Sequence, residues 1–431
     1  MADPQALFQI KSHQTQASHL RSYRKSSRNE NKPFTLDVKQ YIPRNNLNPG
    51  EDDVTVVAAG GIGFPKECYE PLFAEILTRC NSRNLNVRGF WIADSASMGF
   101  STVLNSGHLG SEVSWWDHSR DLLHLINTFH AEMPRPLVGL GHSMGAAQMA
   151  YLSTLHPSLF TSLVLIEPVI YPEGQVETTL TQMRYMLRRP EQWPSRAAAE
   201  KAIRKSPYYG SWDPRVLDRI VRHGLRERQS PKAGDIRKGP EGTPVRTVAS
   251  KELEVAHIIR LNDRGVGMQG NEAITHEDRR IIPDMDPTCP SAPLYNPFTR
   301  QMFFLLPTLR PWVLYIDGES SPRATPENIQ SRLETTGTGQ GGSGGLRAGT
   351  IKHHFVKGGQ HTIPLDMHLG EVACAAGTFI AEEMGRYRES LDKEDPVEDN
   401  EVEGMPKLDP KLLYTIENFK EASKPFKGSK L

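Results

Sequence analysis

One short stretch, residues 136–157, most constrains what this chain can fold into, because a G-x-S-x-G motif there lies between a strand pattern and a helix pattern. The apolar run at 137–140 is typical of a strand buried on both faces. The motif residues Gly141, Ser143 and Gly145 fit a nucleophile elbow, a strained turn that lifts a serine hydroxyl away from the backbone and needs small flanking residues. A glycine-rich turn before an ordinary helix is the alternative, which this context disfavours.

Strand patterns recur along the chain and alternate with helix patterns. They are FTLDVKQYI (34–42), VTVVAA (54–59), LNVRGFWIA (85–93), SLVLI (162–166), WVLYI (312–316) and IKHHFV (351–356). An amphipathic helix begins near Trp115, with an apolar stripe at positions 122, 125, 126 and 129. This alternation predicts an α/β fold with a mostly parallel sheet and helices on both faces.

Residues 171–307 interrupt this pattern, because they are polar, rich in proline and irregular in period. A segment of this length is too long for a loop in a compact domain, so we expect an inserted cap over the strand ends, where α/β sheets bind ligands. The predicted organisation is a basic N-terminal segment (1–33), the first part of the core (34–170), the cap (171–307), the second part of the core (308–387) and a charged flexible tail (388–431). Within the second core part, the glycine-rich residues 335–349 predict a flexible surface loop.

Composition favours no particular class of macromolecular partner. The 51 basic and 51 acidic residues balance, which gives no indication of a nucleic-acid or membrane-surface partner. No apolar stretch is long enough to cross a bilayer. The four cysteines are scattered without zinc-site spacing, so we expect reduced thiols and no metal site: Cys68, Cys80, Cys289 and Cys374.

The chain ends in Ser429, Lys430 and Leu431. A terminal SKL is an address that the peroxisomal import receptor reads on a free, flexible carboxyl end. The preceding residues, about 388 to 428, are rich in charge and proline, as such a tail should be. We therefore expect the protein in the peroxisomal matrix; a chance match in a charged tail is the alternative.

Two backbone amides are candidates for an oxyanion hole. The amide of Met144 lies at the start of the helix after the elbow, where it can face a developing oxyanion. The strand at 54–59 runs into a glycine-rich loop, in which Gly60 and Gly61 permit close approach to a substrate and the amide of Ile62 is the second candidate. An ordinary strand-to-helix loop is the alternative reading.

A serine nucleophile needs an imidazole as base, and the expected chain order is serine, acid, histidine. His361 fits because it lies on a glycine-containing loop just after the last strand pattern. His353 and His354 fall inside that strand, and His368 begins a helix. His361 is therefore the predicted base.

The acid has two candidates, Glu167 and Asp317, each at the end of a strand pattern. The usual position, a few residues beyond the 312–316 strand, holds Ser321 and thus no carboxylate. We favour Glu167, because Asp317 comes early enough to point along its strand. For either residue the alternative role is capping of the next helix.

The cap contains a basic stretch in which the guanidinium groups could bind the phosphates of a charged thioester carrier. A solvated helix face is the alternative, and the charge pattern favours it. The stretch comprises Arg184, Arg188, Arg189, Arg196, Lys201, Arg204 and Lys205. The candidates for phosphate binding are Arg184, Arg188 and Arg189.

Over about residues 30 to 385 the chain resembles the α/β-hydrolase superfamily. Within the superfamily it more closely resembles fungal peroxisomal hydrolases of secondary metabolism, which include the acyl-CoA hydrolase of mycophenolic acid biosynthesis and the hydrolases of host-selective toxin pathways. In that group the acid follows the strand after the elbow, at Glu167 here, although Asp also occurs there; the first glycine of the oxyanion loop, Gly60, is His in relatives. The resemblance rests on AAGGIGFPKECYEPLF, SWWDHSRDLL, MPRPLVGLGHSMG, LIEPVI, GQGGSGG, GGQHTIP and the SKL end.

The resemblance implies hydrolysis of an acyl-CoA thioester to a free acid and CoA inside the peroxisome, in a toxin or polyketide pathway. The chemistry expected of Ser143, His361 and Glu167 requires no metal or bound cofactor. A carboxylester hydrolase or lipase, an acyltransferase with the same three residues and a non-catalytic binding member remain alternatives. Epoxide hydrolase and dehalogenase chemistry is disfavoured, since it needs a carboxylate where Ser143 stands. The oligomeric state stays open, with a homodimer as one alternative.

Overall fold

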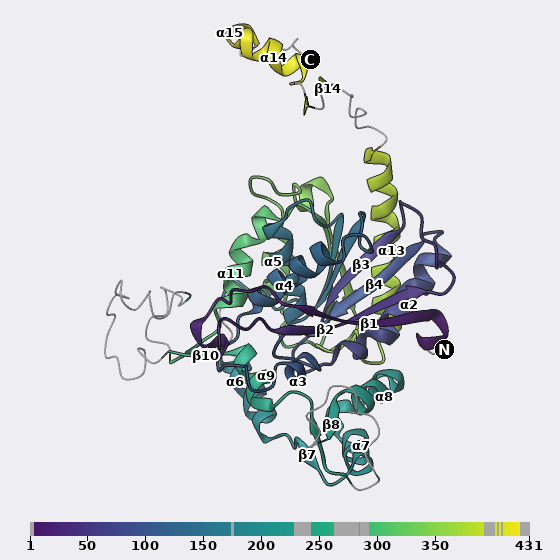
Figure 1. Cartoon of the computed structure of the whole chain (residues 1–431), viewed down its shortest axis with the longest axis vertical. Coiled ribbons are helices and arrows are strands. Elements are labelled where there is room, and N and C mark those ends of the chain that lie inside the picture. Colours follow the sequence, from purple (N-terminus) through teal and green to yellow (C-terminus); the bar gives the residue numbers. More distant parts are fainter. Residues whose placement is uncertain are drawn as a thin grey trace. The chain divides into compact units, whose positions relative to one another are not determined.

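An eight-stranded sheet forms the centre of the computed structural model (Figure 1). Its strands are β1 (Phe8–Gln16), β2 (Thr35–Pro43), β3 (Val54–Ala59), β4 (Val87–Ala93), β5 (Leu137–His142), β6 (Ser162–Ile166), β12 (Trp312–Gly318) and β13 (Ile351–Val356). Their order is β1-β2-β4-β3-β5-β6-β12-β13. The β1–β2 and β2–β4 pairs are antiparallel and the other pairs are parallel, so the sheet is mostly parallel as the sequence predicts.

Helices cover both faces of this sheet. On one face α4 and α11 pack against α5, and on the other α2 and α13 lie together, where Nε of Arg79 donates a hydrogen bond of 2.8 Å to Oγ1 of Thr378 (Figure 1). Strands β3, β5 and β6 are buried at every residue, which explains their unbroken apolar pattern. The helices are α1 (Pro4–Leu7), α2 (Glu70–Ser82), α3 (Ser101–Leu104), α4 (Trp115–Thr128), α5 (Met144–Leu155), α11 (Pro297–Leu305), α12 (Pro326–Thr335) and α13 (Leu369–Leu391).

The N-terminal segment contributes a strand that the sequence analysis did not predict. Strand β1 pairs with β2 from Phe8 opposite Pro43 to Gln16 opposite Thr35. It lies at the edge of the sheet, and most of its side chains are partly or fully exposed, so its apolar pattern is weak. Phe8 anchors it in edge-to-face contacts with Tyr41 and Phe90.

The inserted region forms a cap with its own helices and a small three-stranded sheet of order β7-β9-β8. The last helix of the inserted region, α11, belongs to the core and not to the cap, because Phe298, Met302 and Phe303 pack in the hydrophobic core beside α5. The elements of the insertion before α11 are α6 (Val176–Arg188), β7 (Gln192–Trp193), α7 (Arg196–Lys205), α8 (Pro214–His223), β8 (Leu225–Glu227), β9 (Val245–Thr247), α9 (Lys251–Ile258), β10 (Arg260–Leu261) and β11 (Leu294–Tyr295).

Ion pairs attach the cap to the core through α8. Arg219 approaches Glu70 at the start of α2 to 2.6 Å, and Arg215 approaches Glu75 to 2.7 Å. The Arg219–Glu70 pair is buried on both sides, so this contact replaces water around each charge. The cap is therefore held against the core on the side of the oxyanion loop.

The glycine-rich segment at 335–349 is not the flexible loop that its composition predicts. The amides of Gly337 and Gly339 donate to the carbonyls of Leu306 and Pro307, at 2.8 and 2.9 Å. A Cβ atom on Gly342 would lie 2.4 Å from the carbonyl oxygen of Pro307. These glycines permit close backbone packing rather than flexibility.

The structure describes residues 4–173, 176–227, 243–262, 284, 293–391, 401–402, 405–406 and 408–422. They divide into one unit up to Met384 and a second from Gly385 onward. The second unit includes helices α14 (Pro410–Glu417) and α15 (Phe419–Ala422) in the predicted tail, and the strand pair β14 (Glu401–Val402) and β15 (Met405–Pro406). Ser429, Lys430 and Leu431 lie outside the described residues. In the described part of the chain, no helix has the length and apolarity that crossing a bilayer requires.

Candidate active site

The turn between β5 and α5 holds Ser143 in a backbone conformation that most side chains avoid, with φ 57° and ψ −118°. Its flanking glycines are sterically required. A Cβ atom on Gly141 would lie 2.5 Å from Cα of Ala146, and one on Gly145 would lie 2.2 Å from the carbonyl oxygen of Ala59. The strand, the turn and the helix thus have the geometry that the motif predicts.

Three predicted residues lie in one hydrogen-bonded chain. Oγ of Ser143 is 2.8 Å from Nε2 of His361, and Nδ1 of His361 is 2.9 Å from Oε2 of Glu167. Because a carboxylate only accepts, Nδ1 carries the proton and Nε2 is free to accept the serine hydroxyl. The sheet order explains the meeting, since β5, β6 and β13 are parallel and their carboxyl ends share one edge of the sheet.

The loop that carries His361 must cross the end of β12 to reach Ser143. It does so over Gly318, where a Cβ atom would lie 2.6 Å from the carbonyl carbon of Gly359. The amide of Ser320 donates to the carbonyl of Gly359 at 2.8 Å and fixes the crossing. The loop can therefore bring His361 to Ser143 only because Gly318, at the end of β12, has no side chain.

Glu167 is almost completely buried and fully hydrogen-bonded. Oε1 accepts from the amide of Gly318 and Oε2 from the hydroxyl of Ser321, both at 2.6 Å. Ser321 occupies the position where the acid was expected, and here it binds the carboxylate of Glu167 instead. Glu167 itself has a φ of 48°, a strained conformation that turns it away from the line of β6 toward His361.

The alternative acid, Asp317, has other partners. Its Oδ2 is 2.5 Å from Nη2 of Arg332 and 3.1 Å from Nε2 of His353. Burial acts to raise the pKa of Asp317, but Arg332 and then His353 outweigh it and hold the pKa below its usual range. The competing histidines are also engaged elsewhere, since His354 contacts Glu371 and His368 contacts Asp366.

Two residues that the sequence analysis missed, Tyr69 and His142, bridge the oxyanion loop and the His361 loop. The amide of Gly61 donates to the Tyr69 hydroxyl at 2.7 Å, which is 2.8 Å from Nδ1 of His142, and Nε2 of His142 is 2.9 Å from the carbonyl of His361. Burial, followed by the proximity of His361, lowers the pKa of His142 to about 3, so this imidazole is neutral. Nε2 of His142 must donate to the carbonyl, and Tyr69 therefore donates to Nδ1.

Tyr69 also accounts for the glycine at the first position of the oxyanion loop. A Cβ atom on Gly60 would lie 2.8 Å from Cε2 of Tyr69, so the ring fills the space that a side chain there would need. The only sequence signal for Tyr69 and His142 is the presence of two polar residues near the glycine-rich loop and the elbow. Their contact depends on the three-dimensional approach of β3 and β5.

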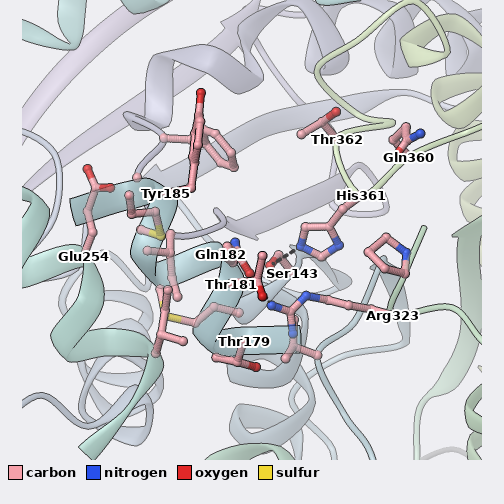
Figure 2. A pocket seen from close by; sticks show the side chains of 18 of the residues that line it. Ser143, Thr179, Thr181, Gln182, Tyr185, Glu254, Arg323, Gln360, His361 and Thr362 are labelled. Carbon is pink, nitrogen blue, oxygen red and sulfur yellow. Dashed lines mark hydrogen bonds between the residues drawn. The ribbon is translucent and has the colours of Figure 1, made fainter. Parts of the chain in front are cut away.

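A cavity of about 820 Å³ opens above Ser143 and His361, and Ile62 and Met144 line it next to the serine. Figure 2 shows Ser143 and His361 joined by a hydrogen bond in its wall. Met144 is the first residue of α5, so its amide belongs to the positive end of the helix. The site can thus combine a nucleophile, a base and the amide at the start of α5 around one reacting atom.

Of the three predicted phosphate ligands only Arg189 lines this cavity, and Arg188 and Arg189 line a second, smaller cavity of about 300 Å³. Arg184 and Arg188 are exposed on α6. Nη2 of Arg189 contacts both carboxylate oxygens of Glu254, at 2.8 and 2.9 Å. Its charge is already compensated by this carboxylate, which disfavours phosphate binding by Arg189.

Arg323 is a cation at the site that the sequence analysis did not single out. It lines the cavity and contacts Oε1 of Gln182 from α6. Figure 2 shows its side chain entering from the side of His361. Since Arg323 lies in the loop between β12 and α12, only the strand order could have indicated its proximity to Ser143.

Fold and site define the class of protein. The model of the α/β-hydrolase family matches residues 56–373, and the chain belongs to that family. The predicted fold class is confirmed. Among solved structures, the peroxisomal α/β-hydrolase Lpx1 from Saccharomyces cerevisiae superimposes with a TM-score of 0.63 at 17% identity, covering 97% of this chain and 99% of that one, and this likeness concerns the fold alone.

Sequence relatives are more specific. The type I acyl-CoA thioesterase mpaH of Penicillium roqueforti (strain FM164) is 36% identical over 406 residues, which cover 89% of each chain. The abhydrolase domain-containing protein AFT2-1 of Alternaria alternata is 35% identical over 146 residues, 34% of this chain and 52% of its own length. The resemblance drawn from the sequence is thereby confirmed, and these relatives support a hydrolase function for the chain.

Proposed function

We propose that this protein is a serine hydrolase that cleaves an acyl-CoA thioester into a free acid and CoA. The observation that carries the proposal is the chain of hydrogen bonds from Ser143 through His361 to Glu167 at a cavity of about 820 Å³. The thioester class rests on the 36% identity to an acyl-CoA thioesterase over 89% of both chains.

In the acylation half-reaction, Nε2 of His361 accepts the hydroxyl proton of Ser143 while Oγ attacks the thioester carbonyl carbon. The carbonyl oxygen becomes an oxyanion, which the amides of Ile62 and Met144 stabilise. The C–S bond then breaks, and CoA leaves either as a thiol with the proton from His361 or as a thiolate while His361 releases that proton to solvent. An acyl ester on Ser143 remains.

In the second half-reaction, His361 accepts a proton from water, and the hydroxide attacks the acyl ester. The same amides hold the second oxyanion, and His361 returns a proton to Oγ of Ser143 as the free acid leaves. Throughout, Glu167 keeps the proton of the neutral imidazole on Nδ1 and balances the charge when the imidazole is protonated.

The test compares acyl-CoA thioesters with oxygen esters of the same acyl groups, with release of CoA followed by a thiol reagent. We expect hydrolysis of the thioesters with one free thiol per free acid. Preferential turnover of oxygen esters would favour a carboxylester hydrolase. A product of higher mass than the free acid, in which the acyl group has been transferred to an alcohol, would favour an acyltransferase. Ser143→Ala supplies the control for background hydrolysis.

We also propose that the reaction takes place in the peroxisomal matrix and belongs to a fungal secondary-metabolite pathway. The support for the location is the SKL tripeptide, Ser429 to Leu431. Deletion of Leu431 should leave a fluorescent fusion, tagged at its N-terminus, in the cytosol. Continued import into peroxisomes would contradict the location.

A further inference from the structure

A second cavity, of about 300 Å³, lies between the cap and the core loops after β3 and β4, beside the cavity that holds Ser143. We call it the cap chamber. It is lined mostly by apolar side chains from α6 to α9 and the small cap sheet, among them Trp193, Ile203, Ile220, Leu225 and Val248. The proposed mechanism does not use this space.

The two cavities meet at a shared wall, the junction, formed by Gly63, Tyr185, Arg189, Tyr208, Tyr209 and Glu254. The pairing of Arg189 with Glu254 removes the net charge there. Gly63, one residue after Ile62, has a φ of 85°, and a Cβ atom on it would lie 3.2 Å from Oε2 of Glu254. The oxyanion loop thus approaches the junction without a side chain to narrow it.

The side chains on the two sides of Ser143 indicate which side suits the acyl group of a thioester substrate and which suits the CoA carrier. In the view of Figure 2, Tyr185 and Glu254 lie on one side of Ser143, and the stem of Arg323 comes from the other side. Arg323 offers a cation to an anionic carrier, whereas the junction leads to a chamber whose lining is mostly apolar, with Arg188 on α6 as its one further guanidinium among the described lining residues. The acyl group therefore suits the side of the junction.

We propose that the cap chamber binds the distal apolar end of a long acyl group, whose carbonyl lies at Ser143 and whose chain passes the junction. The inference rests on the proposed function. At about 30 Å³ for a group the size of a water molecule, the chamber has room for roughly ten methylene-sized groups. Short acyl groups end before the junction and gain nothing from it.

The size of the effect follows from apolar burial. Burial of one methylene is worth about 0.8 kcal/mol, which is roughly a fourfold gain in kcat/KM for each carbon that enters the chamber. Exclusion of three methylenes should then cost on the order of 50-fold. Acyl groups that stay in the first cavity should be unaffected.

The experiment measures kcat/KM for saturated acyl-CoAs from butyryl to palmitoyl. Ala202→Trp fills the chamber from its exposed rim on α7, and Val248→Trp fills it from the buried side; Ala197→Trp, exposed on the same helix and lining neither cavity, is the matched control. We expect kcat/KM of both filling variants to fall on the order of 50-fold for palmitoyl-CoA and to stay within about twofold of the unmodified enzyme for butyryl-CoA. The Ala197→Trp variant should change kcat/KM for neither substrate. If Val248→Trp does not fold, Ala202→Trp carries the test.

A loss that is equal for all chain lengths, or no loss for palmitoyl-CoA in folded protein, would overturn the inference. The same variants with p-nitrophenyl esters of matched chain length separate it from the proposed function. If only esters are hydrolysed and the long esters alone are affected, the thioester proposal fails and the chamber assignment stands. If filling impairs every acyl-CoA but no ester, the chamber binds the carrier, and the assignment is wrong.

Discussion

Replacement of Glu167 by glutamine tests how the site controls the proton on His361. Oε1 accepts the amide of Gly318 at 2.6 Å, and Oε2 faces Nδ1 of His361 at 2.9 Å and the Ser321 hydroxyl at 2.6 Å. A glutamine must keep its carbonyl toward Gly318, because the flipped amide would place two donors together, at a cost of about 1–3 kcal/mol. Its NH₂ group then faces Nδ1, which must become an acceptor.

The imidazole would then carry its proton on Nε2, where it can no longer accept the hydroxyl proton of Ser143. The equivalent change in a serine protease lowers kcat by about 10⁴-fold, or roughly 5.5 kcal/mol, and we expect a loss of that order for Glu167→Gln. The assay is kcat on an acyl-CoA, with thermal unfolding to show that the fold is retained. A loss below tenfold in folded protein would refute this reasoning.

Asp317→Asn is the matched control, since it also neutralises a buried strand-end carboxylate. It removes the negative charge that balances the buried guanidinium of Arg332, so we expect destabilisation of about 3–5 kcal/mol with kcat nearly unchanged in the folded fraction. Ser321→Asp combined with Glu167→Gln should recover part of the activity, because the hydroxyl of Ser321 already reaches the carboxylate that binds His361. A crippled Asp317→Asn beside a mild Glu167→Gln would reverse the assignment of the acid.

Three further predictions concern the oxyanion loop, three buried histidines and the turn at Ser143. Tyr69→Phe leaves the buried amide of the oxyanion loop unpaired, so it should lower the free energy of unfolding by about 1–3 kcal/mol in urea titrations and reduce kcat; unchanged values would contradict the bridge to His142. Burial lowers the pKa of His142 and His118 to about 3 and of His257 to about 4. In this pH range these groups bind protons mainly in the unfolded chain, so their contribution to the free energy of unfolding is complete above pH ~6.5. It falls toward pH ~4 by about 1.4 kcal/mol per pH unit for each histidine. Unfolding measured at pH ~7.5 and ~5.5 checks the slope, and a flat profile would contradict it. Gly145→Ala should yield little folded enzyme, because its Cβ meets a backbone oxygen; normal yield and activity would show that the turn can relax.

The elbow and the sheet could be predicted from the sequence because both depend on local patterns. β5 is buried throughout, and the small residues around Ser143 answer a steric demand of the turn itself. β1 could not be predicted in the same way. It is an edge strand with many exposed side chains, and its stability comes from pairing with β2, which sequence periodicity does not reveal.

The acid was ambiguous because Glu167 and Asp317 end neighbouring parallel strands. Ile166 pairs with Ile316, so both carboxylates lie at nearly the same height on the sheet. What separates them is the positive φ of Glu167 and the guanidinium of Arg332 beside Asp317, and neither is visible in the sequence pattern. The bridge from Tyr69 to His142 is likewise a product of tertiary approach.

The most direct measurement is the turnover of a long-chain acyl-CoA by folded Ser143→Ala. Because the proposed acyl-enzyme requires Oγ of Ser143, we predict that kcat falls by about 10⁶-fold while the thermal unfolding midpoint changes little. A folded variant that still releases CoA within tenfold of the unmodified rate would contradict nucleophilic catalysis by Ser143.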